Sequence, residues 1–137
     1  MTDGIKYICL AEDDADDYYI FSKLLHEVNS AVKLTWFQTC EDLLDYLKAG
    51  NNLPDLIALD MNMPKMDGHS CLVSIKKELE LLPIPVIILS TSNHESTVTK
   101  CYQSGAFKYF QKPDTLDEYR KIINEMLVIT PTALHKS

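Results

Sequence analysis

Short apolar runs alternate with helix-like patterns five times along this chain, and the links between them are short. Residues 7–11, 56–60 and 86–89 are almost entirely apolar, which is typical of strands buried on both faces of a sheet. Residues 32–36 alternate apolar and polar side chains, which predicts a half-exposed strand. Residues 107–111 supply a fifth strand.

Each predicted strand is followed by apolar residues at spacings of three and four, which predicts an amphipathic helix. Thr39 is placed to cap the second helix and Gly50 to end it, while Gly105 ends the fourth. The apolar stripes of the five helices comprise Phe21, Leu24, Leu25 and Val28; Leu43, Leu44 and Leu47; Leu72, Ile75 and Leu79; Val98, Cys101 and Tyr102; and Tyr119, Ile122, Ile123, Met126 and Leu127.

Five strand–helix repeats predict an α/β fold with a parallel sheet and helices on both faces, because crossover connections are nearly always right-handed. The 137 residues fit a single domain, 1–137, with its core at about residues 5–128. Residues 129–137 contain a proline and mixed polarity, so we expect a frayed tail there.

Composition narrows the functional classes. A hydrophobic content of 46% with 24% charged residues is ordinary for a soluble globular protein. The net charge of -7 and the lack of a basic stripe argue against binding to nucleic acid or to an anionic membrane. The first apolar run stops at Glu12 without a basic region before it, and no apolar stretch could span a bilayer. We therefore expect a cytoplasmic protein without a membrane partner.

The four cysteines are placed singly. Cys9, Cys40, Cys71 and Cys101 form no C-x-x-C pair, and three of them fall within apolar or helical patterns. We therefore expect buried free thiols in a reducing compartment.

Carboxylates stand where two of the apolar strands end. Glu12 and Asp13 directly follow the first strand, and Asp60 ends the third. In a doubly wound sheet, ligands bind beyond the carboxyl ends of the strands, where the chain reverses direction. Acids that meet there repel one another unless a cation joins them, and oxygen ligands suit a hard divalent ion such as Mg²⁺.

Two further polar groups fall on the same predicted edge. Ser90 ends the fourth strand and Lys112 follows the fifth. An aspartate becomes a nucleophile toward phosphorus once its charge is neutralised, while a lysine and a hydroxyl can contact phosphoryl oxygens. A metal cluster, a lone aspartate and a lysine therefore indicate chemistry on a phosphoryl group.

These residues resemble the receiver domain of response regulators in two-component signalling, in particular a single-domain protein of the chemotaxis-regulator type. The resemblance covers about residues 5–128. It rests on the acid pair Glu12–Asp13, the stretch 60–68 (Asp-Met-Asn-Met-Pro-Lys-Met-Asp-Gly), Ser90, Tyr109 and the pair Lys112–Pro113.

The resemblance implies a flavodoxin-like fold with strand order 2-1-3-4-5. Asp60 would accept a phosphoryl group from a sensor histidine kinase or a phosphotransfer protein. Asp13, Asp60 and the backbone carbonyl of Asn62 would hold Mg²⁺, with Glu12 acting through water. The chain would thus be a phosphoprotein that serves as a switch and not an enzyme, assisting only its own phosphorylation and dephosphorylation.

The resemblance also implies an output route. Ser90 and Tyr109 would be the switch residues, and a downstream protein target would bind a face made of the fourth helix, the fifth strand and the fifth helix. A cis bond before Pro113 is expected on the same ground. The chain departs from most relatives at three positions. Ser90 stands where threonine is usual, Thr91 is bulkier than the usual alanine, and position 12 is glutamate instead of aspartate.

Several polar residues have a simpler interpretation. Asp14, Asp16 and Asp17 are expected to be solvated or to favour the helix dipole. Asp67 is expected to cap the third helix, and Gly68 to serve backbone conformation. The dispersed histidines, His26, His69, His94 and His135, are expected at the surface.

Two other functions remain open from the residues alone. A flavodoxin-like module could bind a nucleotide or flavin, although no Gly-rich or Ser/Thr-rich loop follows the first strand. A metal-dependent phosphatase could use Asp60 as its nucleophile, but it would need a further acid or base.

Overall fold

Five parallel strands form one sheet in the order β2-β1-β3-β4-β5, as the resemblance implied. The computed structural model describes residues 4–130. The strands are β1 (Tyr7–Ala11), β2 (Lys33–Phe37), β3 (Leu56–Asp60), β4 (Val86–Ser90) and β5 (Lys108–Gln111). The helices are α1 (Ala15–Val28), α2 (Cys40–Ala49), α3 (Gly68–Lys76), the short 3-10 helix η1 (Leu79–Leu81), α4 (Glu95–Gln103) and α5 (Leu116–Leu127).

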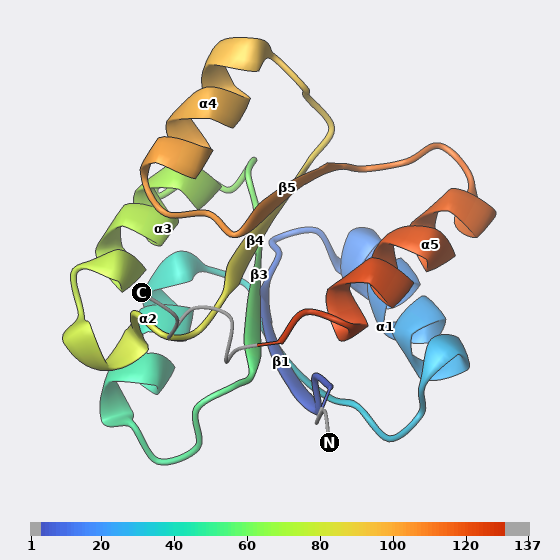
Figure 1. The fold of residues 1–137 in the computed structure, drawn as a ribbon, viewed down its shortest axis with the longest axis horizontal. Helices are drawn as coiled ribbons and strands as arrows, with labels where there is room; N and C mark the ends of the chain where they lie inside the picture. The colour runs from blue at the N-terminus through green and yellow to red at the C-terminus, as the bar shows by residue number, and fades with distance from the viewer. Residues whose placement is uncertain (1–3, 131–137) are drawn as a thin grey trace.

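The helices cover both faces of the sheet (Figure 1). Helices α1 and α5 pack on one face, and α2, α3 and α4 pack on the other. Neighbouring residues of each central strand belong to opposite clusters: Ile57 and Leu59 face α2 and α3, whereas Leu56 and Ala58 face α1 and α5. Burial on both faces explains why the central strands are almost entirely apolar.

Local signals in the sequence position the helices. The Thr39 hydroxyl accepts a hydrogen bond from the backbone of Asp42, and Gly50 ends α2 with a left-handed φ of 70°. The carboxylate of Asp14 accepts hydrogen bonds from Asp16 and Asp17, which caps α1. Helices α1 and α2 therefore begin at capped turns, and Gly50 ends α2.

The apolar stripes predicted for the third and fourth helices each include one residue that is exposed. Helix α3 stops at Lys76, and Leu79 lies in η1 with 82% of its surface exposed. Tyr102 was expected to face inward, but it is 42% exposed on α4. Its hydroxyl accepts a hydrogen bond from the backbone N–H of Tyr109 at 2.9 Å, and this bond connects α4 to the edge strand β5.

The expectation of four free thiols was wrong for two of them. Cys40 and Cys71 form a disulfide between α2 and α3, whereas Cys9 and Cys101 are free and buried. The bonded cysteines are 31 residues apart in sequence, but their Cα atoms lie 5.9 Å apart because both helices pack on the same face. The spacing of the cysteines in the sequence therefore did not predict this disulfide.

The expected tail is only partly within the described residues. Ile129 belongs to the core beside α5 and is 8% exposed, so it is not frayed. Residues 131–137 of that predicted tail lie outside the described residues. Within residues 4–130, no helix is both long and apolar enough to cross a bilayer.

Gly68 allows α3 to start directly against the end of β3. A Cβ atom at this position would lie 2.8 Å from both the Asp60 carbonyl oxygen and the Met61 Cα. Gly68 was expected to serve backbone conformation, but the left-handed φ values in the described residues occur at Lys65, Gly50 and Gly105. Gly68 is needed for a close approach to the backbone of Asp60.

We predict that Gly68→Ala lowers the free energy of unfolding by ~1–3 kcal/mol, because the atoms in contact are backbone atoms that cannot turn aside. Urea unfolding would measure this effect. Ser70→Ala is the matched control, since Ser70 is exposed on the same helix. Equal stability of the two variants would contradict the steric role of Gly68.

Candidate functional site

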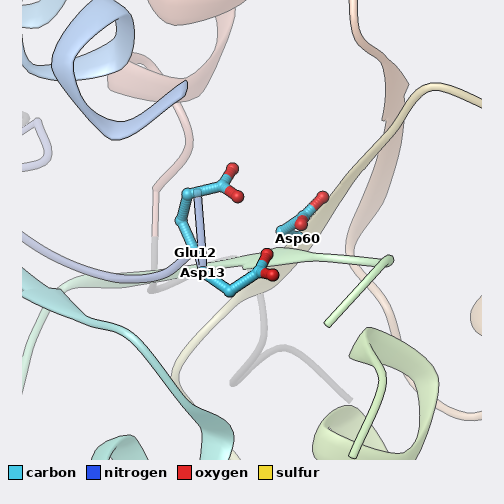
Figure 2. Close-up of side chains that lie close together, drawn as sticks. All are labelled: Glu12, Asp13 and Asp60. Carbon is cyan, nitrogen blue, oxygen red and sulfur yellow. The ribbon is translucent and has the colours of Figure 1, made fainter. Parts of the chain in front are cut away.

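Three carboxylates meet at the carboxyl end of the sheet (Figure 2). Glu12 and Asp13 follow β1, Asp60 ends β3, and one oxygen of each lies within 4.8 Å of the others. Strands β1 and β3 are hydrogen-bonded neighbours, with Ala11 opposite Leu59, so the parallel register brings their ends together. The site thus forms where the chain reverses direction across the sheet, as the sequence predicted.

The donor set fits a hard divalent cation. Glu12 and Asp60 are each 3% exposed, while Asp13 is exposed. The Oδ1 atom of Asp60 is buried and accepts no hydrogen bond from the residues that the structure describes. A buried carboxylate oxygen without a well-aligned hydrogen bond, next to two other carboxylates, is the environment that a bound cation would complete.

Lys112 already brings one positive charge into this cluster. Its Nζ atom lies 3.1 Å from Glu12 Oε1, 3.1 Å from Asp60 Oδ1 and 3.0 Å from Asp17 Oδ2. The contacts to Glu12 and Asp17 are hydrogen bonds, whereas Asp60 Oδ1 is at ion-pair distance only. One ammonium group therefore joins carboxylates from β1, β3 and α1.

Burial controls the electrostatics of this site. It raises the pKa of Glu12 to about 7, and the charge of Asp60 acts in the same direction against the lowering effect of Lys112. Burial also raises the pKa of Asp60. For Lys112, burial would lower the pKa, but the charges of Glu12 and Asp60 outweigh it and raise the pKa overall.

Asp17 lies in the first turn of α1, where an acid favours the helix dipole as expected, but it also makes a contact that was not expected. It is half-buried and contacts a lysine 95 residues away. Its neighbours fit the simpler interpretation, because Asp16 is exposed and Asp14 caps the helix. The sequence signal was too weak to separate the three acids, since the contact depends on how α1 packs beside the end of β5.

Trp36 is a second residue of the site that the sequence did not indicate. Its indole N–H donates a hydrogen bond to the backbone carbonyl of Glu12 at 2.6 Å. Its ring stacks on Tyr18, with ring centroids 4.1 Å apart. Together these contacts fix the backbone at the end of β1 from the side of the edge strand.

Ser90 lies at the end of β4 and is fully buried, and its hydroxyl accepts a hydrogen bond from the Ser92 backbone at 3.1 Å. Thr91 is exposed, and its hydroxyl accepts a 3.4 Å hydrogen bond from the amide of Asn62. Asn62 follows Asp60 by two residues in the β3–α3 loop. These contacts connect the two loops beside the carboxylate cluster.

The predicted switch aromatic is connected to the same loop. Tyr109 is half-buried, and its hydroxyl donates to the Ser92 carbonyl at 2.7 Å. A continuous path of hydrogen bonds and backbone therefore runs from Ser90 through Ser92 and Tyr109 to Tyr102 on α4. The structure thus links the two predicted switch residues, although they lie on different strands.

Other predicted features had mixed outcomes. Asp67 caps α3 by accepting a hydrogen bond from Ser70, as expected. The cis bond expected before Pro113 is wrong, because no peptide bond in the described residues is cis. His69 is half-buried and bonds the Ser104 hydroxyl, contrary to the surface expectation, while His26 and His94 are exposed. His135 lies outside the described residues.

Comparison with known proteins agrees with this geometry. The family model of the response regulator receiver domain matches residues 8–124. The phosphorylated cyanobacterial phytochrome response regulator RcpA is 30% identical, with 88% of this chain and 90% of that chain covered and a TM-score of 0.81. The Mn²⁺-bound form of response regulator Rcp1 is 29% identical, covers 88% and 91% of the two chains, and has a TM-score of 0.75.

A further relative is named as a regulatory protein. The probable methanogenesis regulatory protein FilR2 of Methanothrix harundinacea is 28% identical over 87% of this chain and 79% of its own length. Some other relatives are longer, and the chain spans only 25% of the DNA-binding transcriptional regulator NtrC of Klebsiella pneumoniae, to which it is 30% identical over 93% of its own length. The similarity therefore concerns the region shared by these proteins.

We predict that Glu12 makes the metal-free protein less stable as the pH rises. The folded state raises the pKa of Glu12 from 4.5 to about 7, so it binds this proton more tightly than the unfolded state does. The resulting contribution is fully present below the unfolded pKa and is lost as the pH rises through about 7.

Urea unfolding in a chelator, at about pH 5 and about pH 8, would measure the effect. Relative to Glu12→Gln, the wild type should lose ~1–3 kcal/mol of unfolding free energy between the two conditions. The same substitution at exposed Glu95 controls for general changes in charge. A relative stability that stays constant or increases would show that burial of Glu12 has no such effect.

Proposed function

The chain belongs to the response regulator receiver domain family, and from this premise we propose that Asp60 is its phosphoacceptor. In this proposal the single domain, with its core at residues 5–128, receives a phosphoryl group from a sensor histidine kinase or a phosphotransfer protein. The modified domain then changes its affinity for a downstream protein. The activity is that of a switch, and the domain catalyses only its own modification and its reversal.

The observation that supports Asp60 best is its buried Oδ1 atom. This oxygen accepts no hydrogen bond from the described residues, and the Lys112 ammonium lies 3.1 Å away. A carboxylate oxygen held in this way keeps a free electron pair while its charge is partly compensated. Asp13 is more exposed and Glu12 is bonded to Lys112 and to the Asp14 backbone.

In the proposed reaction, an Asp60 carboxylate oxygen attacks the phosphorus of the donor. A bond forms between this oxygen and phosphorus, and the bond between phosphorus and the donor nitrogen breaks with its electron pair on the leaving imidazole. Lys112 stabilises the negative charge on the phosphoryl oxygens, and the Ser90 hydroxyl can donate to one of them. Positioning and charge compensation account for most of this catalysis.

Mg²⁺ is the cation proposed for the site. The carboxylates of Glu12, Asp13 and Asp60 would hold it with the backbone carbonyl of Asn62, with Glu12 acting through water. When bound, Mg²⁺ supplies positive charge that reduces repulsion between the carboxylates and the incoming phosphoryl group. The Mn²⁺-bound relative supports a divalent ion in this family.

The output is proposed to pass through Ser90 and Tyr109. If the Ser90 hydroxyl turns toward a phosphoryl oxygen, it releases the Ser92 backbone, which also accepts the hydrogen bond of the Tyr109 hydroxyl. The β4–α4 loop and the Tyr109 ring can then rearrange together. This movement would alter the face made of α4, β5 and α5, where we place the binding site of the protein target.

We predict one phosphorylation per chain, at Asp60, in the presence of Mg²⁺. Acetyl phosphate should add roughly one phosphoryl group to the intact mass, with a net charge change of about -1, because the phosphoryl dianion replaces the charge of the carboxylate. Asp60→Asn or a chelator should abolish the gain. Asp16→Asn is the matched control, because Asp16 is an exposed aspartate outside the cluster. Labelling of Asp60→Asn at the wild-type level would disprove the assignment.

For the switch, we predict that Tyr109→Phe and Ser90→Ala do not prevent labelling of Asp60, although Ser90→Ala slows it, and that both weaken its distant effect. NMR spectra would be compared with and without phosphorylation. Wild-type shifts should extend through residues 91–119, and both variants should shrink them because each removes one hydroxyl from the path. Tyr19→Phe is the control, because Tyr19 is an exposed tyrosine on α1, away from this path. Shifts confined to the carboxylate cluster in the wild type would point to another output surface.

A further inference from the structure

We propose that Asp17 is a positioning residue that competes with the phosphoryl group for the ammonium of Lys112. This inference rests on the proposed phosphorylation of Asp60. It assigns a role in the switch to an acidic residue of α1 that lies outside the three-carboxylate cluster.

Three carboxylates already surround the ammonium of Lys112. Its Nζ atom donates hydrogen bonds to Glu12 at 3.1 Å and to Asp17 at 3.0 Å, and it lies 3.1 Å from Asp60 Oδ1. A phosphoryl oxygen on Asp60 would therefore share the charge of this ammonium with Asp17, which draws the Nζ atom toward α1.

Asp17 differs from the other two partners of Lys112. Glu12 and Asp60 belong to the carboxylate cluster, where a divalent cation would compensate their charge. Asp17 is not in this cluster, so it keeps its full negative charge when the cluster is loaded. It then becomes the main carboxylate that holds the lysine away from the phosphoryl group.

The strength of this competition is limited by solvent. The Asp17 side chain is 41% exposed and that of Lys112 is 12% exposed. Water screens such a pair, so Asp17 can be displaced by a dianionic phosphoryl group, which carries more charge. Asp17 should therefore reduce the affinity for a phosphoryl group several-fold without preventing its binding.

Beryllofluoride, which mimics a phosphoryl group on an aspartate, provides a binding test that does not depend on turnover. It would be titrated into the full chain at saturating Mg²⁺. The fluorescence of Trp36, the single tryptophan, is a suitable signal because its indole bonds the Glu12 carbonyl. Asp17→Asn keeps the shape of the side chain, removes its charge and should bind beryllofluoride several-fold more tightly than the wild type.

Asp16→Asn is the matched control, because it removes the same charge from the same helix turn at a residue that is exposed and absent from the contacts of Lys112. It should bind like the wild type. A double-mutant cycle with Lys112→Met adds a second test, since the gain from Asp17→Asn should disappear once the ammonium is gone. If the Lys112→Met protein binds too weakly to titrate, the difference in beryllofluoride affinity between Asp17→Asn and Asp16→Asn tests the proposal.

Three results would overturn the role of Asp17. These are equal affinities of Asp17→Asn and Asp16→Asn, weaker binding by Asp17→Asn, and a gain that persists in Lys112→Met. Equal affinities, or a gain that persists in Lys112→Met, would indicate a general effect of charge. Weaker binding by Asp17→Asn would indicate that Asp17 holds Lys112 in the position that binds the phosphoryl group. Failure of the proposed function would look different, because the wild type itself would then show no binding that depends on Asp60.

Discussion

The ion pairs of Lys112 are the interaction on which the functional end of this fold depends. A parallel sheet places the ends of β1 and β3 side by side, and in this chain both ends carry buried acids. Without compensation, Glu12 and Asp60 would repel each other in a region of low dielectric constant. The Lys112 ammonium lies between them and also contacts Asp17, so it holds together β1, β3, the end of β5 and α1. One ammonium offsets part of the negative charge of these carboxylates, and the negative charge that remains favours the binding of a further cation.

The same arrangement connects the chemistry to a surface. Ser90 ends the strand next to β3, and its hydroxyl bonds the loop to which Tyr109 is also bonded. Tyr102 then ties α4 to the backbone of β5. In the proposed switch, a change of charge at Asp60 would reach α4 through these hydrogen bonds. Because each contact is local, the path requires no large movement of the sheet, whose central strands are buried on both faces.

Most of the fold could be predicted from the sequence because it is encoded in local patterns. The buried runs, the cap at Thr39 and the stop at Gly50 each depend on neighbouring residues, and the acids at the strand ends follow from strand direction. The contacts that escaped prediction join distant segments. Cys40 meets Cys71 and Asp17 meets Lys112 only after the helices have packed. The close approach of Gly68 to Asp60 is likewise visible only in three dimensions. Periodicity identifies which face of an element is buried, but it does not identify the individual partners across that face.

The most direct test of the central role of these charges is an NMR titration of the aspartate and glutamate carboxyl carbons, with and without Mg²⁺. In the metal-free protein, Glu12 should titrate at a pKa of about 7, well above exposed glutamates, because it is buried beside Asp60. Mg²⁺ should lower that pKa, since the cation favours the charged carboxylate. A Glu12 carboxyl that titrates in the ordinary range and does not respond to Mg²⁺ would contradict the view that buried, mutually repelling acids await a cation at this end of the sheet.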